Sequence, residues 1–361
     1  MTSFHTASPV PSSVAMQTLS AESLPPHGLP SWTDIAAALK LVRPHVQPSP
    51  LLSWPLLNDR TGCEVLVKHE NHNPTGAFKV RGGIVYLTRL LAEQPDLPGV
   101  ITATRGNHGQ SVARAAQALG LRCVIVVPTC NSPEKNALMR ALGAELVVEG
   151  RDVQESSEIA DRMARDSGLH KIPSFHPWLV AGVATYGLEL FEAAPDLDAV
   201  LVPVGMGSGV CGVLAARDAL GVKAQVYGVV ADGAPAYGLS WQEKRVVCSD
   251  RADTIADGVA CRSPVPQVVS ALVQRSAGVL SVSDDEIAAA MRHYFTDTHN
   301  VAEGAGAVPL AALLRHADQF RGKKVGLILS GGNADSSLFH QVLQGQSIDG
   351  FRCYSDWMPV I

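Results

Sequence analysis

After about residue 30, apolar positions follow two alternating patterns, and together these predict an α/β protein. Short continuous apolar runs predict buried strands, and apolar residues at helical spacing predict helices that cover a sheet. The runs interpreted as strands are Val100–Thr104, Cys123–Val127, Glu145–Val148, Val200–Val204, Gln225–Val230 and Val325–Leu329. Helices are predicted over Gly109–Leu119 and from about Pro133, Val153, Gly209, Asp284 and Ala305.

The order of these elements predicts two open sheets. Strands that alternate with helices imply parallel strands joined by right-handed crossovers. We therefore expect an α/β fold of two parallel-sheet domains, with the ligand in the cleft between them. The small domain is placed at residues 99–180, and the large domain at residues 31–98 and 181–345.

The two ends of the chain are assigned to neither domain. Residues 1–30 are rich in Ser, Pro and Thr without periodicity, which predicts a flexible extension, and residues 346–361 form a tail. We expect the first helix to begin near Thr33 as the N-cap, because Ile35, Leu39 and Val42 then share one face before Pro44.

Composition narrows the class of protein. The 361 residues are 46% hydrophobic and 17% charged, as in an ordinary globular protein. A net charge of −5 without basic runs argues against nucleic acid or an anionic membrane as a partner. No apolar stretch approaches the roughly 18 residues of a membrane span. Seven scattered cysteines and twelve dispersed histidines predict a protein of the reducing cytoplasm with no metal site.

One lysine stands where a nucleophilic amine is favoured. The run Asn73–Gly83 reads Asn-Pro-Thr-Gly-Ala-Phe-Lys-Val-Arg-Gly-Gly, a turn followed by a helical pattern. Lys79 therefore lies near a helix N-terminus, where the helix dipole and burial both disfavour an ammonium. A lysine with a lowered pKa suits Schiff-base chemistry, although most lysines at helix starts are simply solvated.

Three further motifs follow predicted strands. Thr104–Gln110 (Thr-Arg-Gly-Asn-His-Gly-Gln) offers backbone N–H groups to a carboxylate or phosphate, and Ser330–Asp335 places a hydroxyl at a strand end. The glycine-rich turn Val202–Gly212 is a candidate phosphate cradle. Its Gly207-x-Gly209-x-x-Gly212 spacing, with Asp232 about 20 residues on, also fits a dinucleotide fingerprint, so a nicotinamide-dependent oxidoreductase is the rival on this segment.

Taken in order, the four motifs resemble the threonine/serine dehydratase group of pyridoxal-phosphate (PLP) enzymes, which includes serine racemase. The resemblance runs from about Asp34 to Asp335. It argues against a nicotinamide-dependent oxidoreductase, because dinucleotide binding does not require the motif Pro-Thr-Gly-Ala-Phe-Lys. Further matches are Ser49–Leu52, Val67–Asn71, Thr254–Gly258 and Ala302–Gly304. The resemblance implies the tryptophan synthase β-like PLP fold (fold type II), a PLP cofactor and a homo-oligomer, expected to be a dimer.

The resemblance also implies residue roles. Lys79 is expected to form the Schiff base and to move protons, with Phe78 beside the cofactor. Asn107 is expected to meet the ring hydroxyl, and Ser330 the pyridine nitrogen. The phosphate is assigned to Gly205, Met206, Gly207, Ser208 and Gly209. The substrate is assigned to Thr104, Arg105, Gly106, Asn107 and His108.

Several positions depart from the group's pattern. Arg105 stands where a Ser is common in this group. In racemases that Ser is the acid/base on the second face of the substrate α-carbon, and an arginine cannot readily replace it in this role. The guanidinium is suited instead to a substrate carboxylate, unless it turns outward to a surface acid. The acidic metal ligands of serine racemase would fall near Val230 and Ala236, which cannot chelate.

The expected activity is elimination of the β-hydroxyl of a small β-hydroxy amino acid, giving a 2-oxo acid and ammonia. A neutral hydroxyl at Ser330 keeps the ring a weaker electron sink, which favours prompt elimination. The alternatives are a racemase or a β-replacement synthase that uses the same cofactor, and a PLP-binding protein without catalytic activity. The presence of Lys79 argues against the last of these.

Overall fold

The structure is a computed structural model that describes residues 26–346 and residue 348. Most of the predicted N-terminal extension, residues 1–25, lies outside the described residues. The same holds for residue 347 and for residues 349–361 of the predicted tail.

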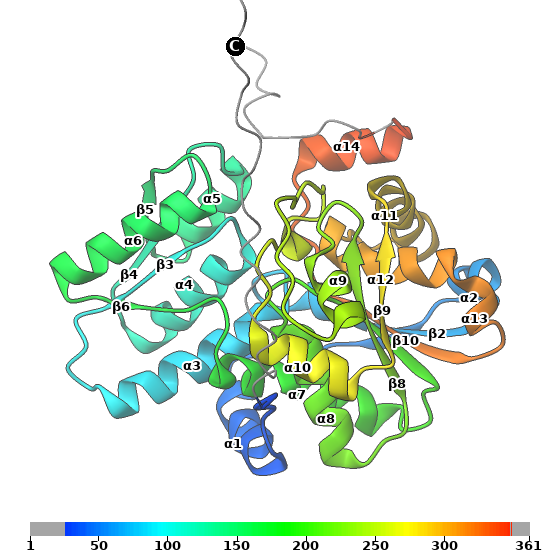
Figure 1. The fold of residues 1–361 in the computed structure, drawn as a ribbon. Coiled ribbons are helices and arrows are strands. Elements are labelled where there is room, and N and C mark those ends of the chain that lie inside the picture. Colours follow the sequence, from blue (N-terminus) through cyan, green and yellow to red (C-terminus); the bar gives the residue numbers. More distant parts are fainter. Residues whose placement is uncertain (1–25, 347, 349–361) are drawn as a thin grey trace, which may run out of the picture.

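Within the described residues the strands form two separate sheets (Figure 1). The larger sheet has six strands in the order β1-β2-β10-β7-β8-β9, and the smaller has four in the order β5-β4-β3-β6. The larger contains β1 (Leu51–Ser53), β2 (Glu64–His69), β7 (Ala199–Pro203), β8 (Gln225–Ala231), β9 (Gly278–Val282) and β10 (Lys324–Leu329). The smaller contains β3 (Val100–Ala103), β4 (Cys123–Val127), β5 (Glu145–Val148) and β6 (His170–Lys171).

All paired neighbours in both sheets are parallel except β1, which pairs with β2 in the antiparallel sense. The expected parallel-sheet domains are confirmed, and β1 adds an antiparallel edge strand that was not predicted. β1 follows Pro50 and is three residues long, too short to show an apolar pattern in the sequence. The parallel core places the carboxyl ends of β10, β7 and β8 on one side of the larger sheet.

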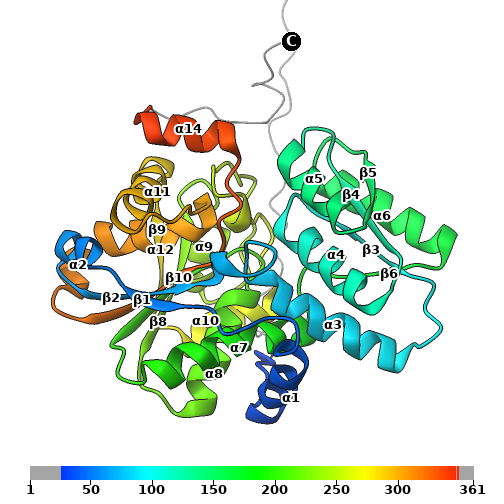
Figure 2. The ribbon, with the colours of Figure 1, turned by 180° about the vertical axis from the view of Figure 1, so that it is seen from behind.

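Helices cover both faces of the sheets, as the two views show (Figures 1 and 2). They are α1 (Trp32–Val42), α2 (Pro55–Thr61), α3 (Lys79–Glu93), α4 (Asn107–Leu119), α5 (Pro133–Ala141), α6 (Val153–Ser167), α7 (Pro177–Ala193), α8 (Ser208–Leu220), α9 (Ala236–Glu243), α10 (Pro266–Arg275), α11 (Asp284–Thr298), α12 (Gly304–Arg315), α13 (Ala317–Phe320) and α14 (Ser336–Gln344). Two short 3-10 turns, η1 (Glu70–His72) and η2 (Asp257–Val259), lie in the loops.

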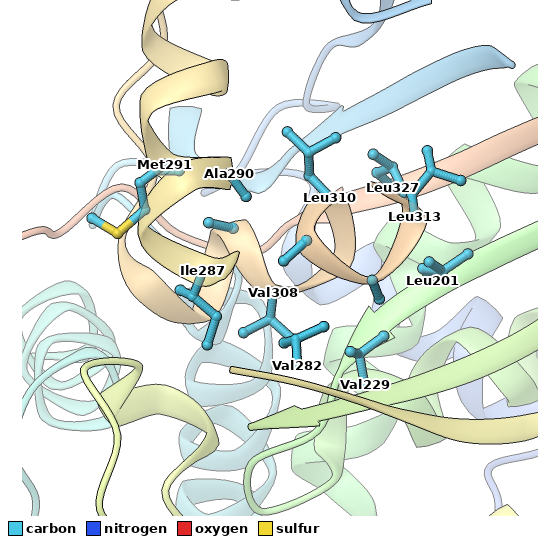
Figure 3. Packing of buried hydrophobic residues seen from close by; sticks show 14 of the residues in the cluster. Leu201, Val229, Val282, Ile287, Ala290, Met291, Val308, Leu310, Leu313 and Leu327 are labelled. Atoms are coloured by element: carbon cyan, nitrogen blue, oxygen red, sulfur yellow. The ribbon is translucent and has the colours of Figure 1, made fainter. Parts of the chain in front are cut away.

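Alternate residues of the strands separate the two faces of the larger sheet. Leu201 and Val229 point to the side of α11 and α12, where they pack with Val308, Leu310 and Leu313 (Figure 3). Val200, Val202 and Val226 point to the opposite side, toward α7, α8 and α10. Each fully buried aliphatic side chain of this kind contributes about 1.5–3 kcal/mol.

Some boundaries differ from the predicted ones because of capping. The N-cap of α1 is Ser31 and not Thr33: Ser31 accepts from the Asp34 backbone N–H while Asp34 accepts from Ser31 N–H, a capping box. Helices α4 and α8 begin at Asn107 and Ser208, earlier than predicted, which places the polar residues of both motifs in first helical turns. The proposed domain boundary at residue 180 falls inside α7.

Candidate active site

An open cavity of about 450 Å³ lies between the two sheets. It is bordered by residues that follow β3, β7 and β10, the strand ends at which the sequence motifs were found. The structure brings together all of the predicted site residues in its lining: Phe78, Lys79, Thr104, Arg105, Gly106, Asn107, His108, Gly205, Met206, Gly207, Ser208, Gly209 and Ser330.

Lys79 is the first residue of α3, and Phe78 is its N-cap. Its Nζ lies 3.3 Å from Ser208 Oγ and 5.1 Å from the centre of the Phe78 ring. Part of the side chain is accessible from the cavity, but protein surrounds the amine, and this burial lowers the pKa of Lys79 to about 8. A substantial fraction of the amine is therefore neutral near physiological pH, as a nucleophile or base requires.

A buried ionic network fixes the helix that carries Lys79. Arg81, two residues along α3 and fully buried, donates to both oxygens of Glu70 and both oxygens of Glu189, at 2.8–3.0 Å. Lys68 of β2 donates to Glu189 at 2.7 Å. The network ties β2, η1, α3 and α7 together beneath the cavity, so the start of α3 has little freedom to move.

The turn before α8 is an uncapped helix N-terminus. Gly207 is the N-cap with φ +91°, and no side chain caps the helix. A Cβ on Gly207 would overlap the side chain of Val268, and one on Gly205 would overlap the carbonyl oxygen of Gly258. Only glycine therefore lets the backbone N–H groups stand open toward the cavity, which suits a phosphate.

The turn between β3 and α4 brings polar groups to the opposite wall. Asn107 Nδ2 donates to Glu303 Oε1 at 2.7 Å, and Asn333 Nδ2 donates to Asn107 Oδ1 at 2.8 Å. Burial raises the pKa of Glu303. Burial, with the nearby Lys79 charge, lowers the pKa of His108 to about 3, so this imidazole is neutral, and its Nε2 is buried without a partner in the described structure.

Arg105 borders the cavity, but its side chain is partly exposed, and the carboxylate that it faces, on Asp257, is also exposed. Its Nη1 lies 3.6 Å from Asp257 Oδ1. Lys135 of α5 lies 3.4 Å from Asp257 and 3.2 Å from Asp335. These charges also border a smaller adjoining pocket of about 120 Å³.

Ser330 ends β10 next to the start of α3. Its carbonyl accepts from the Phe78 N–H at 3.0 Å, and Ala77 bridges to Gly331. The side chain is buried and borders the cavity. The loops that carry Lys79 and Ser330 are thus joined by backbone hydrogen bonds.

Among the lining residues that were not assigned to the site from the sequence are four polar ones that interact there: Lys135, Asp257, Glu303 and Asn333. Asp257, Glu303 and Asn333 lie in segments already noted, Thr254–Gly258, Ala302–Gly304 and Ser330–Asp335, so the match of these segments to the group's pattern was the available signal. Nothing in the sequence marked Lys135, which α5 carries to the cavity from the smaller sheet.

The dinucleotide interpretation of Gly207-x-Gly209-x-x-Gly212 is not supported by Asp232. This residue would bind a ribose, but its carboxylate lies on the surface, 3.3 Å from Arg315, and does not border the cavity. Val230 and Ala236 are both buried apolar residues. Within residues 26–346 and 348, no group of three or more His, Cys, Asp or Glu is arranged to hold a metal ion.

The model of the pyridoxal-phosphate dependent enzyme family matches residues 42–331. The chain belongs to this family. PLP is accordingly its cofactor, and the prediction of a PLP enzyme is confirmed.

Relatives and solved structures agree with this assignment. The L-threonine ammonia-lyase of Thermotoga maritima is 34% identical over 311 residues, 86% of this chain and 77% of that protein. The L-threo-3-hydroxyaspartate ammonia-lyase of a Pseudomonas species is 33% identical over 318 residues, 88% of this chain and 99% of that protein. The crystal structure of a threonine deaminase from T.th. matches with a TM-score of 0.79 and 36% identity, covering 85% of this chain and 99% of that one. The predicted fold type II is confirmed.

In the part of the chain that the structure describes, no helix has the length and apolar character needed to span a bilayer.

Proposed function

We propose that this PLP enzyme is an ammonia-lyase that removes the β-hydroxyl of a β-hydroxy amino acid and releases a 2-oxo acid and ammonia. The observation that carries the proposal is the placement of Lys79. Its amine, with a pKa lowered to about 8, faces the cavity and lies 3.3 Å from Ser208 in the first turn of α8. The amine and the open phosphate cradle border the same cavity, as the covalent and phosphate contacts of one PLP molecule require.

The residues present fit the cofactor. Lys79 would hold it covalently, and the N–H groups from Gly205 to Gly209 would hold its phosphate. Phe78 and Asn107 would contact the ring, and Ser330 would meet the ring nitrogen. When bound, PLP withdraws electrons from the substrate α-carbon and so acidifies its proton.

The protein side chains supply the proton transfers and the orientation. The neutral Lys79 amine would take the proton from the substrate α-carbon and pass it to the β-hydroxyl, which would leave as water. The N–H groups of Asn107 and His108 at the start of α4 would hold the α-carboxylate, while the Gly106 N–H donates to Thr104 Oγ1 and shapes the turn before them. The released enamine then takes up one water and loses ammonia, so the net products are one 2-oxo acid and one ammonia.

The test is release of 2-oxo acid from L-serine, L-threonine, 3-hydroxyaspartate and phenylserine, with Lys79→Ala as the inactive control. Turnover of at least one substrate by the native protein alone supports the proposal. D-enantiomer without 2-oxo acid would identify a racemase instead. Cofactor absorbance that no amino acid changes would identify a silent binder.

We also propose that the enzyme works in the cytoplasm as a dimer. The scattered cysteines support a reducing compartment. Light scattering coupled to size-exclusion chromatography tests the assembly, with a mass near twice 38.1 kDa expected and a mass near 38.1 kDa contradicting it. Fractionation of the source cells tests the compartment.

A further inference from the structure

Arg105 has donor capacity that the protein does not use. Its Nε is buried and has no hydrogen-bond partner in the described structure. Its nearest carboxylate oxygen, on Asp257, lies 3.6 Å away, which is an ion pair but too long for a hydrogen bond. A guanidinium offers five N–H donors in a planar fork, and an unpaired buried donor is costly. The side chain is therefore arranged to receive an acceptor from a ligand.

The anion that Arg105 faces is already balanced by another cation. Lys135 lies 3.4 Å from Asp257 and 3.2 Å from Asp335, so Asp257 shares this second cation with Asp335; Lys135 is much less exposed than Arg105, with 12% of its side chain accessible against 40%. These carboxylates raise the pKa of Lys135, which keeps it charged. Asp257 thus retains a counter-ion when Arg105 turns to a ligand.

In the described structure, the other acidic side chains that border the larger cavity do not form an ion pair with Arg105. Glu303 already accepts a hydrogen bond of 2.7 Å from the side-chain amide at the start of α4. Asp152, Asp250 and Asp253 are exposed to solvent, where water screens their charges. In the described part of the chain, the ion pair of Arg105 is with Asp257 and not with any of these four.

The α-carboxylate of an amino acid substrate has a separate place in the proposed function. Helix α4 begins at Asn107, two residues after Arg105, and no side chain caps its N-terminus. The N–H groups of this first turn attract one carboxylate. Arg105, just outside the helix on the same wall, is then left for a second anionic group on the substrate.

We propose that Arg105 is a specificity-determining residue that selects β-hydroxy amino acids with a second carboxylate on the β-carbon. The inference rests on the proposed ammonia-lyase function and names its substrate class. A planar guanidinium binds a carboxylate through two parallel hydrogen bonds, which neither the methyl group of threonine nor the hydrogen of serine can accept. The Pseudomonas relative named for L-threo-3-hydroxyaspartate is in keeping with this class.

The experiment compares kcat/KM for threo-3-hydroxyaspartate, L-threonine and L-serine in the native holoenzyme, in Arg105→Gln and in Arg114→Gln. Arg114 lies on α4 outside the cavity, hydrogen-bonded to Gln117, and is the matched control. We expect the native enzyme to prefer the dicarboxylate at least tenfold. Arg105→Gln should lower its kcat/KM on the order of 100-fold, as for a lost charge-assisted pair, and leave L-threonine within about threefold.

Two results would overturn the inference: a native preference for L-threonine, or an equal loss for all three substrates in Arg105→Gln. The equal loss would mean that Arg105 serves the shared α-carboxylate. If no substrate is turned over, the proposed function has failed, and a binding measurement then tests the role of Arg105 separately. L-Aspartate, which does not react, should shift the cofactor absorbance at a lower concentration than L-alanine, and Arg105→Gln should remove that difference. Equal affinities of the native protein for the two amino acids would reject the inference about Arg105.

Discussion

Replacing Arg81 by Met tests whether the buried ionic network holds the base of the active site. Arg81 makes four hydrogen bonds of 2.8–3.0 Å to Glu70 and Glu189. In Arg81→Met, Glu189 keeps Lys68 and Arg43 as partners. Glu70 keeps only the neutral donors Ser49 and Asn73 and stays fully buried. One buried carboxylate therefore loses the cation to which it is hydrogen-bonded.

Leaving a buried charge without its partner costs about 3–5 kcal/mol. We therefore expect Arg81→Met to lower the free energy of unfolding by about that amount. Arg81→Lys keeps the charge but not the planar fork, and an intermediate loss is expected.

Urea unfolding, followed by both tryptophan fluorescence and circular dichroism, measures these losses. Arg151→Met is the control, because the Arg151 side chain is 91% exposed and its ion pair with Glu155 is screened by solvent. A loss below about 1 kcal/mol for Arg81→Met, similar to that of the control, would refute the view that the network is a major support of the fold.

Three further predictions concern the cofactor site. Gly207→Ala should raise the dissociation constant for PLP at least tenfold, because the new Cβ overlaps Val268 at a φ of +91°; Gly221→Ala, at φ +67° with open space around it, controls for backbone strain in equilibrium titrations. The rate at which apo-protein captures PLP should rise with pH and reach half its maximum near pH 8, since only the neutral Lys79 amine reacts; a midpoint above pH 10 in stopped-flow absorbance would contradict the lowered pKa. Activity should survive chelation by EDTA, because Val230 and Ala236 offer no side-chain oxygen; loss on chelation and recovery with Mg²⁺ or Ca²⁺ would show the opposite.

The sequence predicted the elements whose periodicity is strong. Cys123–Val127 is a buried strand as expected, because a continuous apolar run is typical of a buried parallel strand; Glu145–Val148 is also a strand as expected, but a partly exposed one at the edge of its sheet. Four strands were not predicted: β1 and β6 are only three and two residues long, and β2 and β9 mix polar with apolar residues. The N-cap of α1 was placed two residues late, at Thr33, because the reciprocal hydrogen bonds of Ser31 and Asp34 that decide the cap are not visible in the apolar periodicity.

The site was predicted only as far as contiguous motifs extend. Lys79, Asn107, Gly207 and Ser330 each follow a strand or turn that the sequence marks, and the fold brings them to one cavity. Lys135 reaches the same cavity only because α5 packs against the turn after β10, a contact between residues about 200 positions apart in the chain. Such pairings of charge depend on tertiary packing, which periodicity does not encode.

Borohydride reduction of the holoenzyme followed by peptide mapping tests the central claim most directly. Reduction fixes PLP to whichever amine holds it, and mass spectrometry of the digest then identifies the residue. We expect the pyridoxyl label on the peptide that contains Lys79, and no label in Lys79→Ala. A label on any other lysine, or none on the native holoenzyme, would contradict the assignment of this cavity as the PLP site.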